Sequence, residues 1–123
     1  MASTNDLIVT ACQRFVTEVP ALAKLPLVFR LELKGRGDVQ VFRVEWPGVD
    51  GPKVSRGEPE DARCELSIPR ADFNVLAEKG TLGDWHDAWD KGLIKSSGDP
   101  AIRQLIANLV ARQEARSQLR RAH

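Results

Sequence analysis

The sequence contains no tyrosine, one methionine, two cysteines and two histidines among its 123 residues. It also lacks a glycine-rich phosphate loop, a nucleophile elbow and an HExxH helix, which argues against the enzyme classes that depend on these motifs. An acid–base enzyme needs a positioned titratable group, and His86 is the only serious candidate, because His123 is the last residue. We therefore expect a protein without enzymatic activity, cofactor or metal.

Long hydrophobic runs and an excess of one charge are also missing. No stretch approaches the roughly 18 apolar residues of a membrane span, and the N-terminus lacks the basic start and apolar run of a signal peptide. The formal net charge of +1 gives no reason to expect nucleic-acid binding. We expect a cytoplasmic protein in which Cys12 and Cys64 are reduced, small apolar core residues.

What the sequence does contain is the material of one small globular domain. Apolar residues make up 42% of the chain and charged residues 28%, which is typical of a folded protein. The length suits one domain with one core. We expect a single domain over residues 1–123, with frayed ends at about 1–5 and 113–123.

The spacing of apolar residues predicts the order of helices and strands. Helical spacing covers Asp6–Val19, capped by Asn5 or Asp6, then Asp72–Lys79, Gly83–Lys91, and a last helix from Pro100 that becomes polar and frays after Arg112. Alternation predicts strands over 29–34, 39–46, 53–56 (an edge), 64–68 and 93–97. In 39–46 both faces carry apolar residues, which indicates a bulge or a strand covered on both sides. The Pro47–Pro52 segment is a turn. This order predicts an α+β fold, with an antiparallel sheet and helices on one face.

His86 lies in the segment Asp84–Asp90, and Asp90 is on the same helical face. It forms either a His–Asp dyad, or half of a metal site, or part of an exposed polar face. We favour the exposed face, because a catalytic or metal site needs further converging ligands.

Two other features each have two interpretations. Trp85 and Trp89 are four residues apart and either pack in the core or form a flap over a ligand cavity. The basic tail contains Arg112, Arg116 and Arg120 on one helical face. It either touches an anionic membrane transiently or is a solvated helix end, and we favour the latter.

Two segments resemble the sterol carrier protein 2 family. The first is Asp61–Gly80, where a strand with Ala62, Cys64, Leu66 and Ile68 leads into a helix with Asp72, Phe73, Leu76 and Gly80. The second is Lys91–Asp99, which is similar to the family's Gly-Lys-Leu-x-x-x-Gly-Asp strand. The likeness extends over roughly Phe15 to Leu109. It departs at Leu93, where lysine is usual, and at Ser96, where an inward apolar residue is expected.

The resemblance implies a five-stranded, mostly antiparallel sheet covered by helices, with an apolar tunnel between them. Such proteins bind fatty acids, acyl-CoA or sterol-like lipids without catalysis. With the tryptophan segment and the first helix included, the expected ligand-binding residues are Phe15, Phe29, Leu31, Phe73, Leu76, Leu82, Trp85, Trp89, Ile102, Leu105, Ile106 and Leu109. The departures leave the identity of the lipid open.

Three hypotheses follow. The first is a carrier that binds a lipid or another apolar small molecule. The second is a structural or interaction module of the same fold with a filled core, which serves a partner enzyme or forms a homodimer. The third is an enzyme that uses His86 on an apolar substrate. An empty void of ~300 Å³ would cost about 7 kcal/mol, close to the whole stability of a small domain, so we expect any tunnel to be occupied or partly collapsed.

Overall fold

A computed structural model describes residues 3–24, 26–46 and 51–122 of the chain. Residues 47–50 of the predicted turn Pro47–Pro52, and the side chains of Arg120 and His123, lie outside what it describes. The elements, in chain order, are α1 (Thr4–Glu18), the 3-10 helix η1 (Pro20–Lys24), β1 (Leu27–Lys34), β2 (Val39–Trp46), β3 (Lys53–Arg56), β4 (Cys64–Pro69), α2 (Arg70–Lys79), α3 (Leu82–Asp90), β5 (Lys95–Gly98) and α4 (Pro100–Ala122).

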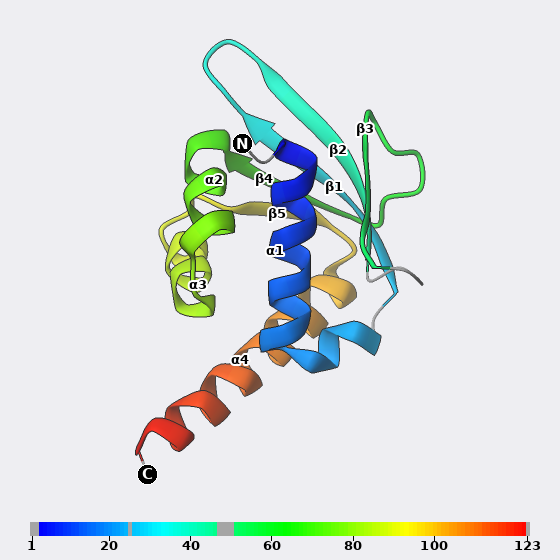
Figure 1. The fold of residues 1–123 in the computed structure, drawn as a ribbon. Helices are drawn as coiled ribbons and strands as arrows, with labels where there is room; N and C mark the ends of the chain where they lie inside the picture. The colour runs from blue at the N-terminus through cyan, green and yellow to red at the C-terminus, as the bar shows by residue number, and fades with distance from the viewer. Residues whose placement is uncertain (1–2, 25, 47–50, 123) are drawn as a thin grey trace.

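The five strands form one sheet in the order β3-β2-β1-β4-β5. All neighbours are antiparallel except β1 and β4, which run parallel, so the sheet is mixed but mostly antiparallel, as predicted. The predicted position of β3 at one edge is also confirmed. Figure 1 shows α1 and α2 in front of the sheet and α4 passing below it. The fold is therefore α+β, with its helices gathered on one face and at one end of the sheet.

The first helix begins earlier than predicted because its cap is Ser3. The Asp6 backbone N–H donates to Ser3 Oγ at 3.2 Å, and the Ser3 N–H donates to Asp6 Oδ2 at 3.4 Å. These two reciprocal bonds make a capping box, which satisfies backbone donors that a helix start leaves free. The expectation of a cap at Asn5 or Asp6 was wrong, since Asp6 instead supplies the returning carboxylate.

Strand β2 has neither the bulge nor the two-sided cover that its apolar pattern indicated. It pairs with β1 without interruption from Val39 to Trp46. Phe42, Val44 and Trp46 are buried on the inner face, whereas Val39 is exposed on the outer face. The valines thus satisfy the strand's preference for β-branched side chains without needing a second layer.

The fifth strand begins two residues later than predicted, because α3 ends in a Schellman motif. Gly92 has a φ of 78°, and its N–H donates to the Trp89 carbonyl at 3.1 Å. The Leu93 N–H donates to the Ala88 carbonyl at 3.0 Å. Leu93 is therefore used to close the helix, and the strand can start only after this turn.

Helix α4 begins as expected and continues further than expected. The Asp99 carboxylate accepts a hydrogen bond from the Ala101 N–H at 2.9 Å, and Pro100 takes the first helical position. We expected the helix to fray beyond Arg112, but it runs to Ala122. No helix within the described residues is long and apolar enough to cross a membrane.

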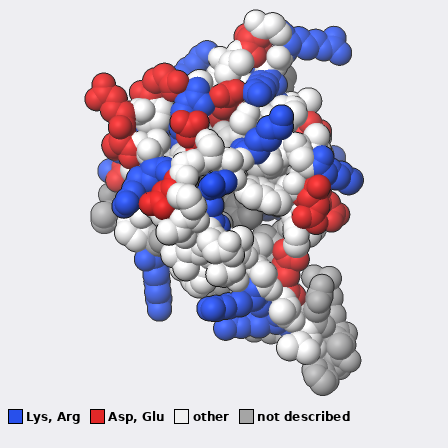
Figure 2. All heavy atoms as spheres, turned by 180° about the vertical axis from the view of Figure 1, so that it is seen from behind, with Lys and Arg blue, Asp and Glu red and all other residues white. Residues whose placement is uncertain are grey.

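The sheet has one apolar and one charged face. On the outer face Arg30 donates to Glu32 and Glu58, each at 2.7 Å, and Arg43 makes a two-bond contact with Asp61. Figure 2 shows acidic and basic side chains intermixed over the face turned away from the viewer in Figure 1. The hydrophobic core therefore lies entirely on the inner side.

The inner face divides into two parts. In the first, which we call the packed region, Leu33, Phe42 and Val44 of the sheet are at most 2% exposed. They lie beneath α1 and α2, whose backbones pack closely together. In the second, which we call the open region, α3 and α4 lie over Phe29 and Leu66, and these side chains are only partly buried.

Candidate ligand-binding cavity

The open region encloses a cavity of about 360 Å³. Its floor is the inner face of the sheet, where Leu31 of β1 stands beside Leu66 of β4, and Leu66 beside Ser96 of β5. Its walls come from α1, the start of α2, α3 and α4. The volume lies within the range of small-molecule sites.

Most of the residues that the sequence indicated for ligand binding line this cavity. These are Phe15, Phe29, Leu31, Phe73, Leu82, Trp85, Trp89 and Ile106. Four do not line it. Leu76 is buried in the core instead, Ile102 and Leu109 pack against the core from outside the cavity, and Leu105 is 43% exposed.

On α4, the predicted ligand-binding face is rotated about the helix axis from the face that lines the cavity. The side chains that reach the cavity are Arg103, Ile106, Ala107, Val110, Ala111 and Glu114. Their spacing of three and four residues makes one stripe along the helix. Leucines and isoleucines occur at several angles around α4, so choosing the most apolar positions selected Ile102, Leu105 and Leu109, which lie to one side of this stripe.

The two tryptophans of α3 take different positions. Trp85 packs edge-on against Phe15, with ring centroids 5.1 Å apart, and against Phe73 at 6.2 Å. Trp89 also lines the cavity but is 46% exposed. Trp85 therefore joins the aromatic core while forming a wall, and Trp89 stands at the rim. The core interpretation is confirmed for Trp85, and the flap stays a prediction for Trp89.

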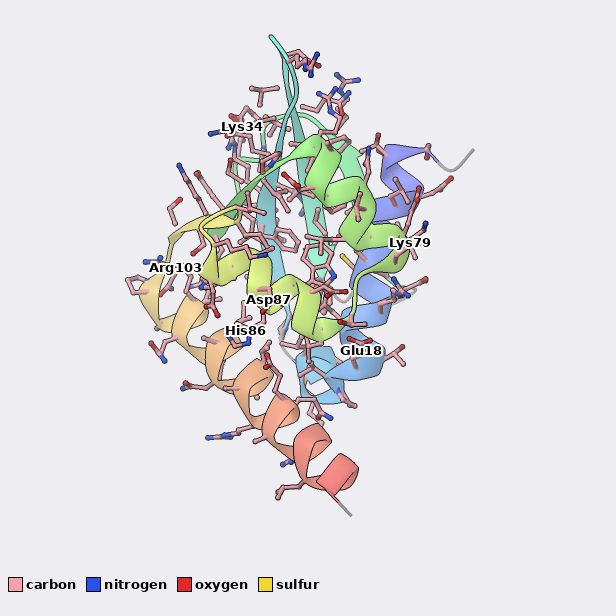
Figure 3. All side chains as sticks on the ribbon, turned by 90° about the vertical axis from the view of Figure 1, so that its left-hand side faces the viewer. Glu18, Lys34, Lys79, His86, Asp87 and Arg103 are labelled. Carbon is pink, nitrogen blue, oxygen red and sulfur yellow. The ribbon has the colours of Figure 1, made fainter. Side chains whose placement is uncertain are left out.

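His86 joins α3 to α4. Its Nδ1 lies 2.7 Å from Glu114 Oε1, and its Nε2 lies 3.4 Å from Asp90 Oδ2. Figure 3 shows His86 between the two helices. The hydrogen bond to Glu114 raises the pKa of His86 above its usual value, with Asp90 and Asp87 adding to the effect. His86 is exposed, as favoured from the sequence, but both ring nitrogens are engaged by carboxylates and it also lines the cavity.

Both cysteines line the cavity as free, buried thiols. Burial raises the pKa of Cys12 to about 12, and burial also raises the pKa of Cys64. Both side chains are therefore uncharged near neutral pH and act as small apolar wall residues, as predicted.

Arg103 is one of several cavity residues that were not predicted from the sequence, and it carries a positive charge. Its Nη1 donates to the Ser96 carbonyl at a long 3.4 Å, and its Nε is buried without a hydrogen-bond partner among the described residues. Figure 3 shows it near the β5 end of α4. The signal was present in the sequence, since Arg103 is the one cation in the stripe with Ile106, Ala107 and Val110.

A second hollow of similar volume lies between the end of α1, η1 and α4. It is lined mainly by polar and charged side chains, including Glu18, Arg112 and Arg116, together with Leu109. No group of three or more metal-ligating side chains occurs among the residues described. The apolar cavity is therefore the better candidate for a functional site.

Comparison with known proteins shows likeness in structure rather than in sequence. No family model and no curated protein sequence matches the chain. Among solved structures, palmitated sterol carrier protein 2 like 2 from Aedes aegypti matches with a TM-score of 0.57 and 22% identity, covering 84% of this chain and 93% of that one. Sterol carrier protein 2 from Aedes aegypti in complex with palmitate matches with a TM-score of 0.51 and 16% identity, covering 90% of this chain and 97% of that one. A ubiquinone synthesis protein, UbiJ-SCP2, matches with a TM-score of 0.50 and 19% identity, covering 93% of this chain and 97% of that one.

Proposed function

We propose that this chain, which has the sterol carrier protein 2 fold, binds and transfers a long-chain lipid in the cavity of the open region, without catalysis. The observation that supports this most is the cavity itself, whose wall is built from aromatic and aliphatic side chains. Two structures of the same fold contain palmitate. A fatty acid, an acyl-CoA or a sterol-like lipid are the ligand classes we propose.

The energetics of the cavity favour an occupied state. At roughly 24 cal/mol per Å³, a closed and empty void of about 360 Å³ would cost about 9 kcal/mol. The entire stability of a domain is on the order of 5–15 kcal/mol. Each buried methylene of a ligand returns about 0.8 kcal/mol, so a lipid chain can offset the loss of packing that the open region entails.

The two alternatives have less support. A structural module with a filled core would have a closed interior, whereas here α3 and α4 leave Phe29 and Leu66 only partly covered. An enzyme that uses His86 would need a free imidazole nitrogen facing the substrate. Glu114 and Asp90 lie within 2.7 and 3.4 Å of the two nitrogens, so we propose that His86 links helices rather than reacting.

The test is to identify what the protein carries and what stabilises it. The purified chain should release a lipid that is detected by native mass spectrometry and lipid extraction. After delipidation, addition of palmitate, a sterol or an isoprenoid quinone at about 100 times its dissociation constant should raise the melting temperature by about 10 °C for the ligand that binds. A quinone is included because one matching structure is a ubiquinone synthesis protein.

A short-chain detergent, added as a monomer at the same concentration as the lipids, serves as the control for non-specific effects. If no lipid is found in the purified protein and none of the three ligands raises the melting temperature, the carrier function is wrong.

A further inference from the structure

The cavity is electrically asymmetric along α4. Arg103 stands at one end of the stripe and Glu114 at the other, with Ile106, Ala107 and Val110 between them. Eleven residues of helix separate the two charges, about 16 Å along the axis at 1.5 Å per residue. The cavity therefore has an apolar wall between two polar ends, and a ligand with a single polar head group would use one of these ends.

The two ends differ in whether their charge is already paired. Glu114 lies 2.7 Å from the His86 ring and is satisfied by it. Among the described residues that line the cavity, Arg103 is the only charged side chain without an oppositely charged partner. The remaining ionisable wall residues, Cys12 and Cys64, are neutral thiols. An incoming anion would therefore be attracted to the Arg103 end, where the charge is unpaired.

The guanidinium of Arg103 has hydrogen-bonding capacity that the protein leaves unused. Its Nε is buried without a partner among the described residues, and its one bond to the protein, to the Ser96 carbonyl, is 3.4 Å long. Arg103 itself is only partly buried, but a polar nitrogen that is buried without a hydrogen-bond partner is costly. Ser96 lines the same corner from β5, beside Leu66, and brings a hydroxyl where the neighbouring wall is apolar.

We infer that Arg103 and Ser96 bind the carboxylate of a long-chain fatty acid, whose hydrocarbon chain extends along α4 toward the His86–Glu114 pair. This rests on the proposed function and specifies its ligand. A carboxylate carries one charge and two oxygens, which matches one guanidinium able to donate two parallel bonds. A phosphate group would bring close to two negative charges to a corner with a single cation.

The test compares two ligands that differ only in the head group. Binding of dodecanoate and of dodecanol is measured by calorimetry on the full chain as wild type, as Arg103→Met and as Arg112→Met. Arg112 is the matched control, because it is an exposed arginine of the same helix outside this cavity. Arg103→Met should weaken dodecanoate about 10- to 100-fold, the range expected for losing a charged hydrogen bond. The dissociation constant of dodecanol should change by less than about threefold in every variant.

Equal weakening of both ligands by Arg103→Met, or no change in either, would overturn the assignment of Arg103 while leaving the lipid-binding function intact. If wild type binds neither ligand, the proposed function itself fails. Should Arg103→Met not fold, dodecanoate labelled with carbon-13 at the carboxyl is titrated while bound to wild type. A carboxyl pKa below that of the free acid in water supports the ion pair, and one at or above it overturns the inference.

Discussion

The packed region and the open region are built on one face of one sheet, with the same kinds of side chain. Leu33 and Leu66 point inward from the neighbouring strands β1 and β4, near each other in the register. Leu33 is 0% exposed, whereas Leu66 is partly buried and lines the cavity. Hydrophobic content is thus not what separates core from cavity. The difference is what lies above each side chain, because Leu33 is covered completely whereas Leu66 faces the cavity.

The helices over the two regions differ in the contacts that hold them in place. The backbones of α1 and α2 pack directly against each other, which brings their small residues Ala11 and Ala77 into the core. Large rings at Phe15, Phe73 and Trp85 instead stand between α3 and its surroundings. Phe15 and Phe73 belong to α1 and α2, so these two helices supply both small residues in the core and large rings in the cavity wall.

The largest effect should come from removing a leucine on each side of this division. Leu33→Ala should lower the free energy of unfolding by about 2–5 kcal/mol, because it leaves a void in close-packed surroundings. Leu66→Ala should cost about 1 kcal/mol in the lipid-free protein, because that side chain already faces a cavity. Chemical denaturation of both variants measures this. Equal losses would mean that the two regions are equally well packed.

The opposite substitution sharpens the same comparison. Leu33→Trp should destabilise the protein by about 1–3 kcal/mol through overpacking. Leu66→Trp should leave stability unchanged or higher, since the larger ring occupies free space, and it should weaken lipid binding at least tenfold. Denaturation and calorimetry on both variants give the two readouts. Lipid binding that survives Leu66→Trp would place the ligand outside this cavity.

The smallest expected effect is a pH dependence confined to the open region. Because the pKa of His86 is raised in the folded protein, its pairing with Glu114 contributes in full below about pH 6.5, the ordinary histidine value, and is lost as the pH rises through the folded value. His86→Gln should therefore lose up to about 1 kcal/mol relative to wild type near pH 5.5 and almost nothing near pH 9, as expected for an exposed pair.

Unfolding of wild type, His86→Gln and Glu114→Gln across that range measures the effect. Glu114→Gln should flatten the pH dependence in the same way, because it removes the same pairing. A difference that instead grows with rising pH would contradict a stabilising role for the charged imidazole.

Local pattern was enough to predict most of the fold and two residues of the cavity floor. Alternation placed Phe29 and Leu31 on the inner face, because strand geometry fixes which side a residue takes. Helical spacing found α1 but not its cap, since Ser3 precedes the apolar stripe by several residues. Leu105 was misplaced because α4 has apolar residues at several angles, and local spacing cannot tell which of them meets the sheet.

The polar features of the site were the least predictable from sequence. His86 and Glu114 are 28 residues apart, and no local pattern links two groups that meet only after α3 and α4 dock. Arg103 was overlooked for a different reason. A charged residue in an apolar stripe normally marks its edge, and only the three-dimensional arrangement shows that this guanidinium has a buried, unpartnered nitrogen.

The single parallel strand pair has a consequence for the order in which the chain can fold. The β1–β2–β3 meander uses contacts between neighbouring segments and can form early, but β1 cannot pair with β4 until the chain has returned across the sheet. Non-local pairing of this kind is slow. The cavity floor, where Leu31 stands beside Leu66, is completed when β4 pairs with β1. A chain that still lacks β4 therefore has only part of the floor of this cavity.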